Sequence, residues 1–105
     1  MDNAEVTTKI QKMIDDNKIM LFMKGNKNEP QCGFSAQVLH LLNQHQADFE
    51  TFNVLEDWDV REGIKAFSNW PTIPQLYVKG KFVGGCDIAM ELERKGELGA
   101  VLAAE

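Results

Sequence analysis

One cysteine stands where a loop is predicted to enter a helix, and this position suits a reactive thiol. Cys32 follows a polar stretch that contains Gly25 and Pro30, and apolar residues at helical spacing begin directly after it. The N–H groups and the dipole of a helix N-terminus lower the pKa of a thiol, and the thiolate is the form that acts as nucleophile or metal ligand. Lys24, at the end of a predicted strand, is expected to place a positive charge near the same thiol. A free cysteine is often an inert core residue, but this position favours a functional one.

Ser35 stands where a dithiol motif would carry its second, resolving cysteine. Cys32 therefore cannot close a Cys-x-x-Cys disulfide, which disfavours conventional dithiol reduction. Gly33 beside it lets other groups approach the sulfur closely.

The segment 70–74, with the sequence WPTIP, is predicted to bend the chain just before a strand. A proline at the start of a strand cannot donate to the ladder, and a cis X–Pro bond is favoured in tight turns, so Pro74 is the cis candidate. Such a bend would leave the backbone N–H and C=O of Ile73 free to pair with a short peptide as an added strand. An ordinary rigid turn is an equally valid interpretation of these residues.

Two further features could bind a carboxylate. The residues 84–87, GGCD, resemble a turn that opens a helix with free N–H groups, although Gly-Gly before a helix is common. Arg61 and Lys65 lie one helical turn apart and could reinforce such binding, but basic pairs are more often part of a solvated face. His40 and His45 are five residues apart, which is not the spacing of a helical metal pair, so no ligand role is assigned to them.

Hydrophobic periodicity predicts the elements that position these residues. Helices are expected over 4–17, from 32 to 42, over 60–67, from 87 to 92 and over 97–103, and strands over 19–23, 49–54, 75–78 and 81–83. Asp87 is the expected N-cap of the fourth helix and Gly96 its C′ residue. Lys79 and Gly80 form the expected two-residue hairpin turn. Right-handed crossovers and short connections then favour an α/β fold, a four-stranded mixed sheet with helices on both faces.

Length and composition bound the class of protein. The 105 residues are 44% hydrophobic and 26% charged, which is typical of one globular domain, 1–105, that needs neither disulfides nor structural zinc. Two cysteines are too few for a secreted framework and indicate a reducing compartment. The balance of 11 Lys and Arg against 16 Asp and Glu, a net charge of −5, disfavours nucleic acid as a partner.

No targeting or membrane segment is predicted. The N-terminal residues carry acidic side chains and lack the character of a signal or transit peptide. The longest apolar run, 19–23, is far shorter than the roughly 20 residues that span a bilayer. A cytoplasmic protein is expected, although an organellar form from which a transit peptide had been removed would have the same sequence.

Four short motifs together resemble the monothiol glutaredoxins of the CGFS class. They are MKG at 23–25, CGFS at 32–35, WPTIPQ at 70–75 and GGCD at 84–87. The resemblance extends from Ile19 to Leu98, and the order and spacing of the four motifs make it specific. It implies a thioredoxin-like fold in which Pro74 is the cis-proline.

The resemblance also implies a glutathione site. Lys24 and Arg61 would hold the glycine carboxylate, and the backbone of Ile73 would pair with the cysteinyl part. Cys86 and Asp87 would hold the γ-glutamyl end. Cys86 leaves two interpretations open, a disulfide with Cys32 under oxidation or a backbone N–H contact with glutathione, and the second is favoured because nothing in the sequence indicates a lowered pKa.

The supply of thiolates predicts how a metal cluster would be held. A [2Fe–2S] cluster needs four thiolates, and one chain offers Cys32 together with one bound glutathione. Two chains and two glutathiones supply the four, which predicts a homodimer that shares the cluster, with Cys32 as the metal ligand. The resemblance implies the same assembly. It also implies that the cluster is delivered to apo iron–sulfur proteins, and that BolA-type proteins are heterodimer partners.

Two other functions remain open. In the first, Cys32 is the catalytic nucleophile of a glutathione-dependent thiol–disulfide oxidoreductase that removes glutathione from mixed disulfides, and the resemblance implies that such activity is weak. In the second, the chain is an adaptor that uses the site only to dock a partner. The iron–sulfur carrier is the primary hypothesis.

Overall fold

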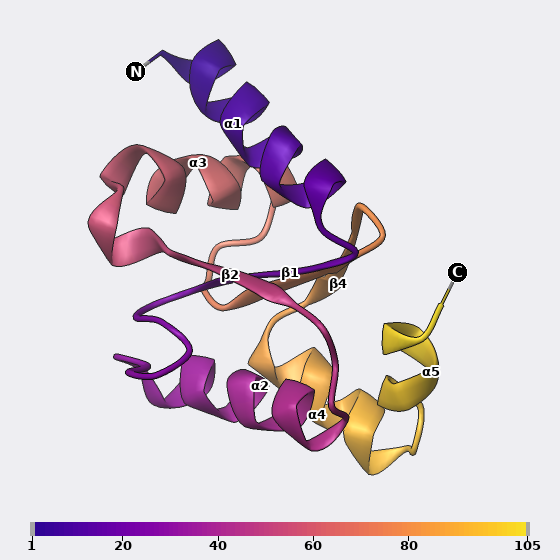
Figure 1. Ribbon diagram of the computed structural model, residues 1–105. Coiled ribbons are helices and arrows are strands. Elements are labelled where there is room, and N and C mark those ends of the chain that lie inside the picture. Colours follow the sequence, from indigo (N-terminus) through magenta and orange to yellow (C-terminus); the bar gives the residue numbers. More distant parts are fainter. Residues whose placement is uncertain (1, 105) are drawn as a thin grey trace.

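Four strands form a single mixed sheet at the centre of the protein (Figure 1). The computed structural model describes residues 2–104. The strand order is β2-β1-β3-β4, in which β1 (Ile19–Met23) pairs with β2 (Glu50–Asn53) in parallel. β3 (Gln75–Val78) is antiparallel both to β1 and to β4 (Lys81–Gly84).

Helices cover both faces of this sheet, as Figure 1 shows. On one face lie α1 (Asn3–Asp16) and α3 (Trp58–Ser68), and a 3-10 turn, η1 (Val54–Glu56), leads into α3. On the other face lie α2 (Gly33–Gln44), α4 (Cys86–Arg94) and the short α5 (Leu98–Leu102). The predicted four-stranded mixed sheet with helices on both faces is therefore confirmed.

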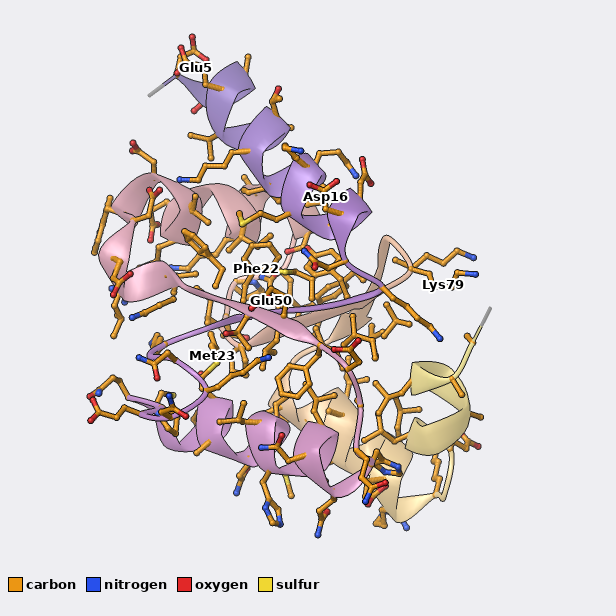
Figure 2. The ribbon with its side chains drawn as sticks, in the orientation of Figure 1. Glu5, Asp16, Phe22, Met23, Glu50 and Lys79 are labelled. Atoms are coloured by element: carbon orange, nitrogen blue, oxygen red, sulfur yellow. The ribbon has the colours of Figure 1, made fainter. Side chains whose placement is uncertain are left out.

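The central strand β1 is buried on both faces, which explains its uninterrupted apolar sequence. Successive side chains of a strand point to opposite faces. Phe22 accordingly packs in the core below α1 and α3, whereas Met23 packs in the core beside α2 and α4, and Figure 2 shows the two on opposite sides of the ribbon. Two hydrophobic cores thus share one strand.

The segment that follows β1 is more ordered than its polar sequence indicates. Gly25 and Pro30 form an isolated antiparallel bridge, and the N–H of Gln31 donates to the carbonyl of Lys24 at 2.8 Å. The N–H of Asn26 donates to the carbonyl of Glu29. Residues 24–31 therefore fold back on themselves as a tight turn rather than as an irregular loop.

The start of α4 corrects one expectation from the sequence. Asp87 is not the N-cap of this helix. Gly85 occupies that position and accepts the first helical hydrogen bond, from the N–H of Ala89, so the helix begins at Cys86. The Gly-Gly bend moves the N-cap two residues earlier than predicted, from Asp87 to Gly85, which places Asp87 in the first turn of the helix. At the other end, Gly96 follows the C-cap with a positive φ of 73°, as predicted for a C′ glycine.

No helix within residues 2–104 is long and apolar enough to cross a membrane.

Replacing Gly25 by alanine should destabilise the protein, because its φ is +93° and an added Cβ would clash with the carbonyl oxygen of Glu29. The closest atoms are that oxygen and the amide nitrogen of Gln31. Both belong to the backbone, so neither can move away without distorting the turn. We expect the free energy of unfolding in urea to fall by about 1 to 3 kcal/mol.

Gly33→Ala is the matched control, because an added Cβ at Gly33 meets nothing within 4 Å. Its unfolding free energy should change by less than about 0.5 kcal/mol. Equal stability of the Gly25→Ala variant and the parent would contradict the tight turn described above.

Candidate functional site

The six residues singled out from the sequence line one cavity of about 500 Å³. They are Lys24, Cys32, Arg61, Ile73, Cys86 and Asp87. The sheet register explains why they meet. Phe22 pairs with Gln75, so the end of β1 lies beside the start of β3, and the end of β4 lies there too because Leu76 pairs with Gly84. All the segments that carry the site therefore leave the sheet at the same edge.

Cys32 is the N-cap of α2 and is partly exposed to the cavity. Partial burial opposes the charged form of this thiol. The backbone N–H groups of Ser35 and Phe34, the positive charge of Lys24 and the Ser35 side chain together outweigh it, and the pKa of Cys32 lies below its ordinary value. The helix N-terminus thus supplies the field that the sequence position predicts.

Ser35 has a structural task in place of a second thiol. Its side chain is fully buried, and its hydroxyl oxygen accepts a hydrogen bond of 3.1 Å from the backbone N–H of Lys24. This bond ties the end of β1 to the first turn of α2. Lys24 and Cys32 both line the cavity, and the charge of Lys24 acts on the Cys32 thiol.

The peptide bond between Ile73 and Pro74 is cis, as predicted. Ile73 lies in the cavity wall, and within residues 2–104 neither its N–H nor its C=O has a hydrogen-bond partner. A backbone donor and acceptor are therefore free at the place where an added peptide strand would lie.

A buried glutamine holds the segment before that cis bond, and this role was not foreseen from the sequence. Gln75 is fully buried, and its Nε2 donates to the carbonyls of Trp70 and Thr72, each at 3.1 Å. The hydroxyl of Tyr77 donates to Gln75 Oε1, also at 3.1 Å. Burial raises the pKa of Tyr77 to about 12, so this donor stays protonated at neutral pH. A lone amide in an otherwise apolar strand was the available signal.

Cys86 lies in an environment opposite to that of Cys32. It is buried, and its sulfur donates to Oε1 of Gln37 on α2 at 3.0 Å. Burial, and then the negative charges of Asp87 and of the Cys32 thiolate, raise the pKa of Cys86. The second thiol is therefore held protonated, which supports a backbone role for this residue rather than a second nucleophile.

Charged side chains of both signs line the cavity. Lys24, Arg61 and Lys65 all line it, but Lys65 is already paired with Glu62 at 3.0 Å. Asp87, in the first turn of α4, also belongs to the wall. The site thus combines cations, a free backbone segment, a helix N-terminus and a thiolate, which together suit a small peptide with charged ends.

The chain by itself does not provide a complete metal site in the part that the structure describes. No group of three or more His, Cys, Asp or Glu side chains within residues 2–104 is arranged to hold a metal ion.

Two other polar residues that the sequence did not reveal hold the turn after β1. Oδ1 of Asn53 accepts hydrogen bonds from the N–H of Gly25 at 2.9 Å and from that of Leu55 at 3.0 Å. Nζ of Lys27 donates to the carbonyl of Phe49 at 2.6 Å and lies 4.5 Å from the centre of its ring. The contacts of Asn53 with Gly25 and of Lys27 with Phe49 join residues more than 20 positions apart, so local patterns could not predict them.

Comparisons with known proteins agree on one family. The family model described as Glutaredoxin matches residues 19–83. The chain is 60% identical over 87 residues to human Glutaredoxin-3, a match that covers 83% of this chain but only 26% of that protein. It is 53% identical over 100 residues to a Synechocystis protein named "Uncharacterized monothiol glutaredoxin ycf64-like", with 95% of this chain and 94% of that one covered.

Solved structures show the same architecture. Reduced poplar apo GrxS14 aligns with a TM-score of 0.83 at 46% identity, covering 95% of this chain and 93% of that one. A buckwheat glutaredoxin–glutathione complex aligns with a TM-score of 0.84 at 26% identity, covering 95% and 89%. The thioredoxin-like fold expected from the sequence is thereby confirmed.

The reactivity of Cys32 should show its lowered pKa. Alkylation by iodoacetamide proceeds through the thiolate, so its rate should rise at a lower pH than for an ordinary thiol, because the pKa of Cys32 is lowered. Lys24→Gln removes a favourable charge, so the same rise should move to higher pH. Peptide mass mapping at each pH gives the alkylated fraction of each cysteine separately.

Cys86 is the internal control in this experiment. Because its pKa is raised and its sulfur is buried, it should stay unmodified at the pH values where Cys32 reacts. Equal alkylation of both cysteines in the native protein would contradict the opposite environments described above.

Gln75→Met should lower the free energy of unfolding by about 1 to 3 kcal/mol. The carbonyls of Trp70 and Thr72 would lose the donor that Gln75 provides, and methionine offers none in its place. Tyr77→Phe removes one hydroxyl and leaves both of those hydrogen bonds, so it should cost only about 0.5 to 1.5 kcal/mol. Urea unfolding gives both values. A Gln75→Met variant as stable as the parent would show that this amide does not hold the segment.

Proposed function

Because the chain belongs to the glutaredoxin family, as a monothiol member, we propose that it binds glutathione in the cavity beside Cys32 and carries a [2Fe–2S] cluster shared between two copies. The observation that carries this proposal is the single activated thiol. Cys32 has a lowered pKa and lines the cavity. Its motif has no second thiol, because Ser35 stands at that position, buried and hydrogen-bonded to the backbone.

The cavity suits glutathione along its whole length. Lys24 and Arg61 would receive the glycine carboxylate through charge-assisted hydrogen bonds. The free N–H and C=O of Ile73 would pair with the cysteinyl residue like an added strand. The N–H of Cys86 and the side chain of Asp87, at the start of α4, would hold the γ-glutamyl end, with its carboxylate and its amine.

The cluster is the cargo in this proposal, and the number of thiolates sets the assembly. Four thiolates hold a [2Fe–2S] cluster. Each copy supplies Cys32 and one glutathione thiolate, so two copies complete the set. Cys86 contributes no ligand, because its sulfur points to Gln37 and its pKa is raised. A cluster held half by exchangeable glutathione suits transfer to apo iron–sulfur proteins, and a BolA-type protein in place of one copy would give a mixed complex.

A second candidate function rests on the same lowered pKa. The Cys32 thiolate could attack a protein–glutathione mixed disulfide, which forms a Cys32–glutathione disulfide and releases the protein thiolate. A second glutathione thiolate would then attack that disulfide, releasing oxidised glutathione and restoring Cys32. A glutathione-coupled reductase assay on a small mixed disulfide measures this reaction. Turnover at about 1 per second or faster would favour the enzyme over the carrier.

Anaerobic reconstitution with iron, sulfide and glutathione tests the carrier directly. We expect the visible absorption of a [2Fe–2S] cluster in a species with twice the mass of the chain on size exclusion. Cys32→Ser should abolish both the absorption and the dimer, and so should omission of glutathione, because each removes half of the thiolates.

Cys86→Ser keeps the backbone N–H and removes only the sulfur, so it should still form the coloured dimer. Loss of colour in this variant would mean that both thiols of one chain bind iron, which contradicts the proposed ligand set. A colourless monomer under every condition would rule out the carrier function and leave glutathione-dependent thiol transfer.

A further inference from the structure

Trp58 is a large apolar residue at the protein surface, beside Arg61 of the cavity wall. It is 66% exposed, so it adds little to either hydrophobic core. It precedes Arg61 by three positions in α3, which places the two side chains as neighbours on the helix surface. The guanidinium carbon of Arg61 lies 4.9 Å from the centre of the Trp58 ring. This is the geometry of a cation–π contact, for which an indole is the best partner.

No hydrogen bond fixes the buried nitrogen of Arg61. Its Nε is buried and has no hydrogen-bond partner within residues 2–104. The neighbouring cation, Lys65, is by contrast paired with Glu62. The cation–π contact with Trp58 is therefore the polar contact that the structure shows for the Arg61 guanidinium within residues 2–104, and Arg61 lines the cavity.

We propose that Trp58 is a positioning residue that holds Arg61 ready for the glycine carboxylate of glutathione. This inference rests on the proposed function, since it assumes that Arg61 binds that carboxylate. A free arginine side chain loses rotamer freedom when it binds a ligand, and a guanidinium that is already held by a cation–π contact loses less. The terminal N–H donors of the guanidinium can then bind the carboxylate.

Titration of the reduced protein with reduced glutathione, followed by NMR, tests the proposal. Trp58→Ala should bind glutathione about two- to fivefold more weakly than the parent, the size expected of one exposed cation–π contact. Trp58→Tyr keeps an aromatic face and should recover part of the affinity. Leu55→Ala is the matched control, because Leu55 is also exposed, precedes Trp58 by three residues and does not line the cavity; its affinity should be unchanged.

A second ligand separates positioning from a general structural effect. The ethyl ester of the glycine carboxylate lacks the charge that Arg61 would receive. The parent and Trp58→Ala should bind this ester with equal affinity. In an Arg61→Gln background, Trp58→Ala should cause no further loss of glutathione binding, because two residues that act through one contact are not additive. The indole N–H signal of Trp58 should also shift on binding glutathione and not on binding the ester.

Each result decides a different question. If the parent binds glutathione and Trp58→Ala binds it equally well, the positioning role is wrong and the proposed glutathione site stands. An equal loss for glutathione and for its ester also overturns the proposal, since the ring would then act without the carboxylate. If the parent does not bind glutathione, both the proposed function and this inference fail.

Discussion

The two-sided burial of β1 is the constraint on which the site depends. Both faces of this strand are covered, so its position in the sheet leaves little freedom, and its neighbours β2 and β3 are set in register against it. The end of β1 then determines where Lys24 lies, and the pairing of Phe22 with Gln75 brings the cis bond of the segment before β3 to the same edge. The site is thus assembled by an apolar strand that contains none of its residues.

At that edge the hydrogen-bonded ladder ends, and the backbone groups that leave it need other partners. Buried or half-buried polar side chains supply them: Ser35 for the N–H of Lys24, Asn53 for that of Gly25, and Gln75 for two carbonyls before β3. Ser35 and Gln75 are also the buried polar residues of the described chain. A buried polar group is costly unless it is bonded, so these side chains fix the loops as well as fill space.

The two cysteines show how the same fold gives one chemical group opposite properties. At the start of α2, backbone N–H groups and a lysine charge outweigh partial burial and favour the thiolate of Cys32. At the start of α4, deeper burial and nearby negative charge favour the protonated thiol of Cys86, whose sulfur turns to Gln37. Proximity to a helix N-terminus is therefore not sufficient to activate a thiol, because burial and nearby negative charge can outweigh it.

Much of the fold and of the site could be predicted from the sequence. The order of the elements and the buried central strand follow from the hydrophobic period. Four motifs in a known order singled out the residues that meet at the cavity, and they favoured the cis Ile73–Pro74 bond over the ordinary turn that the local residues allow equally. The predicted N-cap of α4, Asp87, was wrong: Gly85 is the N-cap, because a capping preference says nothing of a Gly-Gly bend. Contacts across long separations, such as Asn53 with Gly25 and Lys27 with Phe49, and the direction of each side chain could not be predicted. Local patterns act through the neighbouring backbone, whereas these contacts exist only after the sheet and helices have packed.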